Sequence, residues 1–157
     1  MSEPNDTAKR LFHFDEGVVS MPGGFRDRSS QILEWTVDNT SSVVLVIQRE
    51  RLTIDPRTQL SLTLDDVVAR ETGEYPTRFL GFRLDPNEFP DPTDGTLPLR
   101  RIVFRWKSDR EVLYHHQVFV LSDQLVLTLT MSSSAAHRDR ADHVIQEALS
   151  SLRFRED

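Results

Sequence analysis

The sequence predicts an α+β domain, an antiparallel β-sheet with two main helices packed against it. The first observation is residues 125–131, where Leu or Met alternates strictly with Val or Thr, a period typical of a half-buried strand. The second is the polar break at 122–124, which predicts a tight hairpin with the strand-like run at 112–121. The third is the order along the chain: several strands, one helix, three more strands and a last helix. We expect both helices to lie on one face of the sheet.

The N-terminal half is predicted to hold four strands. Pro22 and the two glycines after it predict a turn, because Pro fixes φ and Gly tolerates positive φ. The strongest strand signal is at 43–50, which is rich in β-branched residues and places Gln48 at the end of the face formed by Val44 and Val46. The expected strands are 11–14, 17–21, 30–37 and 43–50.

The middle of the chain is predicted to hold the first helix. Thr63 resembles the first residue of a capping box in which Asp66 takes the place of Glu. The helix should run to about Glu74, and Pro76 should leave Phe79 in a second, kinked turn. The Pro-rich, acidic stretch at 84–98 is predicted to be a loop.

The C-terminal part is predicted to add three strands and a helix. A strand at 100–107 turns into the hairpin, and Ser132 to Ser134 should cap a helix at about 135–152. Both faces of the run at 112–121 are partly apolar, whereas a strand with one solvent-exposed face would be polar on that face. One face should therefore pack on the core, and the other needs a cover.

The composition limits the class of protein. A chain of 157 residues suits one domain, which we place at 11–157 after a disordered lead-in at 1–10. The net charge of -6 argues against a nucleic-acid partner, since phosphates attract concentrated Lys and Arg. The absence of Cys excludes disulfides and thiolate metal sites. We see no signal peptide and no apolar run of about 20 residues, so we expect a cytoplasmic protein that does not insert into membranes.

No catalytic or metal-binding pattern is present. His115 and His116 are neighbours on a strand and point to opposite faces, so they cannot share one ion without a bulge. Asp65 and Asp66 fit helix capping, and the acids at 91–94 fit a solvated loop. We therefore expect no enzyme activity, no cofactor and no metal. Two amides, Gln48 and Gln117, are more informative because they interrupt apolar strand faces; each is either an exposed amide on a wet face or a polar contact inside a binding groove.

An ordered set of short motifs resembles a known family. The resemblance covers about residues 12–152, nearly the whole chain. The motifs are Met21, Pro22 and Phe25; Ser29, Ile32 and Leu33; the helix start at 64–70; the segment at 79–82; and the segment at 116–119 with the Leu-Thr strand after it. Together they resemble the Eag chaperones, DcrB-like proteins of bacterial type VI secretion.

This resemblance implies both a fold and a function. The fold would be the PsbP-like α+β fold, forming a homodimer whose paired subunits make an apolar groove. The groove would hold the N-terminal transmembrane helices of a secreted effector, usually one with a PAAR domain, and keep them soluble in the cytosol before loading. Such a helix in water exposes apolar surface on every side, at a cost of about 25 cal/mol per Å².

The resemblance also implies which residues line the groove. Ser30 stands where the family has an aliphatic residue, and Glu71 where it has an amide. For Glu71 there are two explanations: the side chain lies at the rim of the groove, or the local alignment is shifted by one helical turn. If Gln117 faces the groove, its amide should meet water in the free protein. The implied groove residues, with two neighbours on the same strand faces, are Ser30, Ile32, Val44, Val46, Gln48, Glu71, Phe79, Gln117 and Phe119.

Two other classes of function remain as alternatives. One is a DcrB-like or PsbP-like accessory module that docks on folded protein or envelope components without binding transmembrane segments. The other is an enzyme, which would need a convergent acid, base or nucleophile set that the sequence does not offer.

Overall fold

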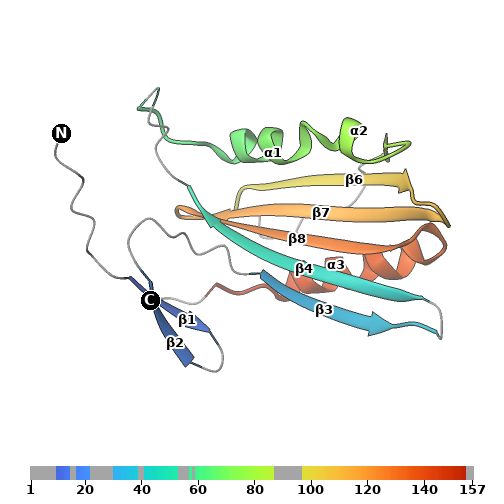
Figure 1. Ribbon diagram of the computed structural model, residues 1–157, viewed down its shortest axis with the longest axis horizontal. Helices are drawn as coiled ribbons and strands as arrows, with labels where there is room; N and C mark the ends of the chain where they lie inside the picture. The colour runs from blue at the N-terminus through green and yellow to red at the C-terminus, as the bar shows by residue number, and fades with distance from the viewer. Residues whose placement is uncertain are drawn as a thin grey trace.

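The computed structural model describes residues 10–14, 17–21, 30–38, 41–52, 57, 59–86 and 97–154. It confirms the predicted α+β class, with a six-stranded antiparallel sheet and helices packed on it (Figure 1). The lead-in up to residue 9, the predicted turn after Met21 and the acids at 91–94 lie outside the described residues. None of the helices in the described part of the chain has the length and apolarity needed to cross a bilayer.

The strands form two separate sheets. The hairpin of β1 (Arg10–Phe14) and β2 (Gly17–Met21) stands by itself, and the main sheet has the order β3-β4-β8-β7-β6-β5 with every neighbouring pair antiparallel. The main strands are β3 (Ser30–Thr36), β4 (Ser42–Arg51), β5 (Arg83–Leu84), β6 (Leu99–Lys107), β7 (Val112–Ser122) and β8 (Leu125–Ser134). The helices are α1 (Leu64–Thr72), α2 (Tyr75–Arg78) and α3 (Arg138–Ser151), the last preceded by the 3-10 turn η1 (Ala135–His137).

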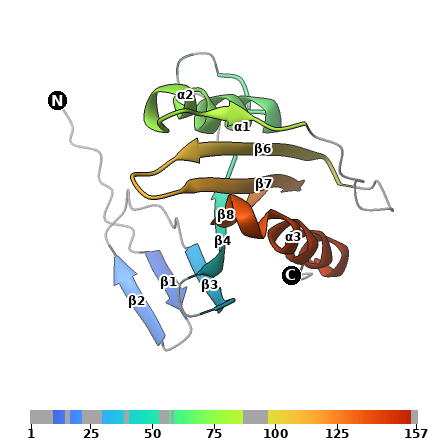
Figure 2. The ribbon, with the colours of Figure 1, turned by 90° about the vertical axis from the view of Figure 1, so that its right-hand side faces the viewer.

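The helices cover opposite faces of the sheet, so the expectation that both lie on one face is wrong. α3 packs on the face that carries Val118 of β7, whereas α1 packs on the face that carries Phe119. Both residues are fully buried, because neighbouring strand residues point apart and each face of β7 is apolar enough to need its own layer. Figures 1 and 2 show α1 and α2 lying along β6 and α3 on the other side.

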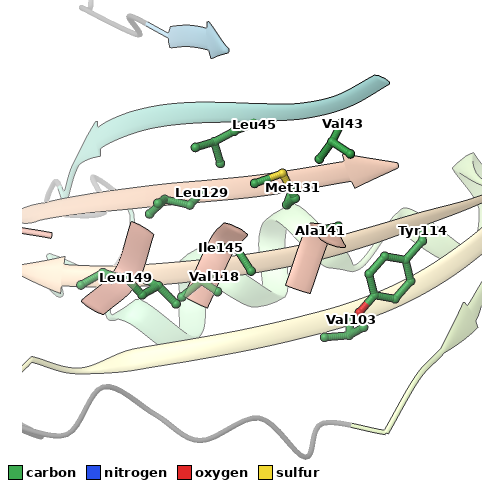
Figure 3. Packing of buried hydrophobic residues seen from close by; sticks show 11 residues of the cluster. Val43, Leu45, Val103, Tyr114, Val118, Leu129, Met131, Ala141, Ile145 and Leu149 are labelled. Carbon is green, nitrogen blue, oxygen red and sulfur yellow. The ribbon is translucent and has the colours of Figure 1, made fainter. Parts of the chain in front are cut away.

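The main core lies between α3 and the sheet. Ala141, Ile145 and Leu149 recur at four-residue spacing, so one side of α3 meets the strands, and all three are buried. Figure 3 shows these side chains pointing toward the strands beneath them. The strand residues of this cluster are Val43, Leu45, Val103, Tyr114, Val118, Val120, Leu129 and Met131.

The start of α1 confirms the predicted capping box. The Thr63 hydroxyl oxygen accepts a hydrogen bond from the Asp66 amide at 3.1 Å, and the Asp66 carboxylate accepts one from the Thr63 amide at 2.8 Å. α1 ends before Gly73, and α2 follows with Pro76 in its first turn, where its missing N–H costs nothing. Phe79 caps α2, so the predicted second turn is also confirmed.

The predicted hairpin at 122–124 is confirmed, but the predicted cap after it is wrong. β7 ends at Ser122, β8 begins at Leu125, and Asp123 takes a positive φ of 52° in the turn. β8 continues to Ser134, because Ser132 and Ser134 pair with β7 as the preceding residues do. Ser134 makes no side-chain capping bond to the turn that follows.

A buried polar network joins α3 to the sheet. His116 is fully buried, and its Nδ1 lies 2.8 Å from Asp142 Oδ1, to which the Tyr114 hydroxyl also donates at 2.5 Å. Its Nε2 meets the guanidinium of Arg101. Because Arg101 only donates, Nε2 must accept, and the ring is neutral with its proton on Nδ1. Burial lowers the pKa of His116; the Asp142 hydrogen bond opposes this shift and the nearby Arg101 charge adds to it.

We expect the fold to lose stability in mild acid. The unfolded chain takes up protons as the pH falls below 6.5, the ordinary pKa of His, while folded His116 resists protonation. His115 acts in the same direction, since burial lowers its pKa to about 4. The stabilisation that the two buried imidazoles provide is therefore complete above pH 6.5, their ordinary pKa, and declines as the pH falls toward about 4. Thermal unfolding across this range should show Tm falling by several degrees.

The matched control for this prediction is His143→Gln. His143 is exposed on α3, and its one ion pair within the described part of the chain is with Glu147, so its loss should change the slope of Tm against pH much less. His116→Gln should flatten that slope. A Tm that stays constant through this range in the wild-type chain would contradict the role given to the two buried imidazoles.

Candidate functional site

The helical layer of α1 and α2 leaves part of its own face of the sheet uncovered. α1 packs on β6 and β7, so Phe119 of β7 is fully buried, whereas Ile32 of β3 is 68% exposed on the same face. We call the uncovered part of β8, β4 and β3 the open face. Its residues are Ser30, Ile32, Glu34, Val44, Val46, Gln48, Thr128, Thr130 and Ser132.

The strand register gathers most of the expected groove residues along this face. Ile32 lies opposite Val46, and Val46 lies opposite Thr130, so the centre of the open face is aliphatic on one side and hydroxylated on the other. Ser30 lies opposite Gln48 at one end. Five of the expected residues therefore share the open face: Ser30, Ile32, Val44, Val46 and Gln48.

An aromatic wall formed by α2 and β6 borders the open face. The Phe79 ring lies 5.1 Å from the Tyr75 ring, 5.5 Å from that of Phe104 and 5.1 Å from that of Trp106, measured between centroids. Phe79 itself is half-buried. These contacts fix the position of the short α2 on the sheet, which four residues of helix could not do alone.

Gln117 is buried, so the expectation that its amide meets water is wrong. Only 6% of the residue is exposed. Tyr75 donates its hydroxyl hydrogen to Gln117 Oε1 at 3.1 Å, and Gln117 Nε2 donates to the Thr130 hydroxyl at 3.0 Å. The Gln117 amide thus links α2 to β8. Phe119, the next β7 residue on the same face, is buried beneath Leu64 and Val67 of α1.

Glu71 lies at the edge of the open face, where its charge is paired. Arg70 Nη2 is 3.2 Å from Glu71 Oε1 and 2.5 Å from Glu50 Oε2. Glu50 lies opposite Val126 of β8, which packs against α1, so this bond ties the end of α1 to β4. The ion pair marks one end of the open face.

A row of hydroxyls along β8 was missed by the sequence reasoning. Thr128, Thr130 and Ser132 all point to the open face, between the aliphatic residues of β4 and the aromatic wall. The alternation at 125–131 contains the signal, but the three serines after it are also typical of a helix cap. Continuing the same period to Ser134 would have placed Ser132 in the row.

The other end of the open face is hollowed into a serine-lined pocket of about 280 Å³. Inside it the Trp106 indole N–H donates to His115 Nε2 at 2.8 Å, and His115 Nδ1 lies 2.9 Å from the Ser132 hydroxyl oxygen. The His115 ring stacks on Phe104 at 4.9 Å. The partners of His115 and His116 confirm that the two rings face opposite sides of the sheet. The pocket is lined by Ser41, Ser42, Val44, Trp106, Glu111, Leu113, His115, Ser132, Ser133 and Ser134.

Comparisons with known proteins identify relatives. The sequence profile of the DcrB family matches residues 16–151. The structure resembles PA94, a protein of unknown function from Pseudomonas aeruginosa, with a TM-score of 0.70 and 19% identity over 95% of this chain and 99% of that one. It also resembles LpqN of Mycobacterium tuberculosis, involved in cell envelope biogenesis, with a TM-score of 0.54 and 15% identity over 92% and 77% of the two chains. At such identities these structures show a shared fold. No curated protein sequence matches the chain significantly.

We expect Gln117→Ala to destabilise the fold by about 1–3 kcal/mol, because the buried Tyr75 hydroxyl and Thr130 lose their partner. Chemical denaturation of the two proteins measures the difference. Gln48→Ala is the control: Gln48 is exposed on the same side of the sheet, and its loss should change stability by less than about 0.5 kcal/mol. Equal effects of the two substitutions would contradict a structural role for the Gln117 amide.

Proposed function

This chain belongs to the DcrB family, and we propose that it acts as a chaperone for transmembrane segments of a type VI secretion effector. In this proposal it binds the N-terminal apolar helices of an effector, one that carries a PAAR domain, and shields them from water in the cytoplasm before loading. The chain itself does not enter a membrane. The Eag-like order of motifs suggested this function, and the open face supports it.

The observation that carries the proposal is the size and composition of the open face. From Ser42 to Glu50, β4 presents a floor about 27 Å long at ~3.4 Å per residue. An α-helix of about 18 residues has that length, which is close to the ~30 Å apolar thickness of a bilayer. Ile32, Val44 and Val46 provide apolar contact along the floor.

The polar groups beside this floor suit a membrane helix better than a purely apolar ligand. Membrane helices pack through small residues and through hydrogen bonds from Ser and Thr. Thr128, Thr130 and Ser132 lie opposite Gln48, Val46 and Val44 and offer such bonds along the middle of the floor. The wall of Tyr75, Phe79 and Trp106 rises on one side only, so a single subunit covers one flank of a bound helix.

A second copy of the chain would supply the missing flank, and we propose a homodimer joined at β3. This strand is at the edge of the main sheet, and all seven of its residues are exposed. Its apolar side chains point to both faces, with Ile32 68%, Leu33 55% and Trp35 49% exposed. An exposed, apolar edge strand favours pairing with another strand. Antiparallel pairing of two β3 strands would join the open faces into one floor between two helical walls.

Sedimentation equilibrium at micromolar concentration tests this dimer. We expect the wild-type chain to sediment at about twice its mass of 18.1 kDa. Leu33→Arg should shift it to the monomer mass without unfolding it, because Leu33 is largely exposed and a two-fold axis near the middle of β3 would bring like charges together. A wild-type monomer would contradict the dimer, and so would a Leu33→Arg variant that remains dimeric.

Co-expression with the N-terminal apolar fragment of a PAAR-containing effector encoded beside this gene tests the chaperone activity. The wild-type chain should keep the fragment soluble and co-purify with it. Ile32→Glu should reduce the recovered fragment at least about tenfold, since a carboxylate on the floor would be desolvated without a partner.

Gln31→Glu is the matched control, because it places the same charge on the neighbouring residue, whose side chain points to the opposite face. Thermal melts of both variants should stay near the wild-type value. A fragment that is insoluble with the wild-type chain, or equally soluble with both variants, would count against the chaperone and favour the accessory module that docks on folded protein.

A further inference from the structure

We propose that Ser132 is a positioned hydrogen-bond donor that binds a backbone carbonyl at the C-terminal end of the client helix, and that His115 is the positioning residue that holds it. The inference rests on the proposed function and adds the direction in which the helix lies on the open face. It derives from the hydrogen-bond chain Trp106, His115 and Ser132.

The chain has only one consistent arrangement of protons. An indole N–H donates and cannot accept, so His115 Nε2, 2.8 Å from Trp106 Nε1, must be the unprotonated nitrogen. A neutral ring then carries its proton on Nδ1, which donates to the Ser132 hydroxyl oxygen at 2.9 Å. The Ser132 oxygen is thereby an acceptor from His115, and its own hydrogen is left to donate elsewhere.

The remaining hydrogen of Ser132 is free to point into the serine-lined pocket. Within the described ranges the Ser132 side chain makes one hydrogen bond, to His115, and it lines the pocket of about 280 Å³ at the end of the open face. The Phe104 ring stacks on His115 with 4° between their planes and holds the imidazole in place. Burial lowers the pKa of His115 to about 4, so the arrangement persists at neutral pH.

The charges around the pocket select the kind of acceptor. Glu111 at its border is exposed and disfavours a carboxylate, while Ser42 and Ser134 add two more hydroxyls. A neutral carbonyl fits these donors. The last four carbonyls of an α-helix have no partner within the helix, and in an apolar ligand they are its main neutral acceptors.

The opposite end of the floor suits the other end of a helix. There Glu50 and Glu71 both pair with Arg70, so two carboxylates meet one guanidinium in this described ion-pair cluster. A helix N-terminus carries a partial positive charge and is stabilised beside such a group. Both ends of the floor therefore favour one orientation, with the client N-terminus near Arg70 and its C-terminus near Ser132.

Cross-linking tests this orientation. The chain has no cysteine, so Ser42→Cys places a unique thiol in the pocket. The probe is a synthetic helix of about 20 Leu and Ala residues with an amidated C-terminus, carrying one Cys at either its first or its last position. We expect the peptide with the C-terminal Cys to form the disulfide at least about fivefold faster, since the proposed bonds at Ser132 hold that end in the pocket.

Binding of the peptide without cysteine tests the role of Ser132. Ser132→Ala should weaken binding by about 3- to 10-fold, as expected for one membrane-type hydrogen bond. Ser150→Ala is the control, because this serine is exposed on α3, on the other side of the sheet, where it bonds the Gln146 carbonyl, and its loss should not affect binding. The ¹⁵N spectrum of the free protein should show His115 as the neutral tautomer with its proton on Nδ1.

The outcomes separate this inference from the proposed function. Equal cross-linking from both peptide ends, unchanged affinity in Ser132→Ala, or an Nε2–H tautomer of His115 would overturn the inference, while peptide binding by the wild-type chain would still support the chaperone. A wild-type chain that binds neither the peptide nor the effector fragment would overturn both.

Discussion

The structure depends on β7, a central strand that is apolar on both faces and therefore needs a layer on each side. Val118 and Phe119 are both fully buried, one under α3 and the other under α1. A helix is about 10 Å wide and strands are ~4.8 Å apart, so one helical layer covers about two strands. Because α1 and α2 lie mainly over β6 and β7, toward one edge of the sheet, the same face of β3, β4 and most of β8 stays open, apart from Val126 beneath α1. The open face is a direct result of this off-centre cover.

Buried polar contacts fix where each layer sits. Gln117 joins Tyr75 of α2 to Thr130 of β8, and Asp142 of α3 receives bonds from Tyr114 and the neutral His116. Apolar packing alone permits small shifts of a helix on a sheet, whereas each of these bonds is lost when the helix moves. α2 has only four residues and relies on such contacts most.

Local patterns made much of the fold predictable, but not the residues that the helices cover. The strand periods, the hairpin and the capping box at Thr63 depend on a few neighbouring residues, and each was predicted from them. The faces of Ile32 and Val46 followed from the same alternation. The burial of Gln117 did not, because it depends on where α2 lies, and α2 is placed by aromatic contacts with residues up to about 30 positions away in the sequence. The place of Ser132 in the hydroxyl row was not predicted, because Ser is frequent both at helix caps and in strands facing polar groups.

The hydroxyl row explains how such a face can remain open in a folded protein. A floor made only of residues like Val46 and Ile32 would be a continuous apolar patch, and patches of this kind favour aggregation. Thr128, Thr130 and Ser132 divide the apolar strand from the aromatic wall, and water can satisfy their hydroxyls while the face is empty. A helix that offers carbonyls or small polar residues can replace that water with little loss of hydrogen bonding and gain the apolar contact as well. An aliphatic helix without accessible acceptors would leave the hydroxyls unpaired. In the proposed complex, the residues that keep the free face hydrated would therefore also make it selective among apolar helices.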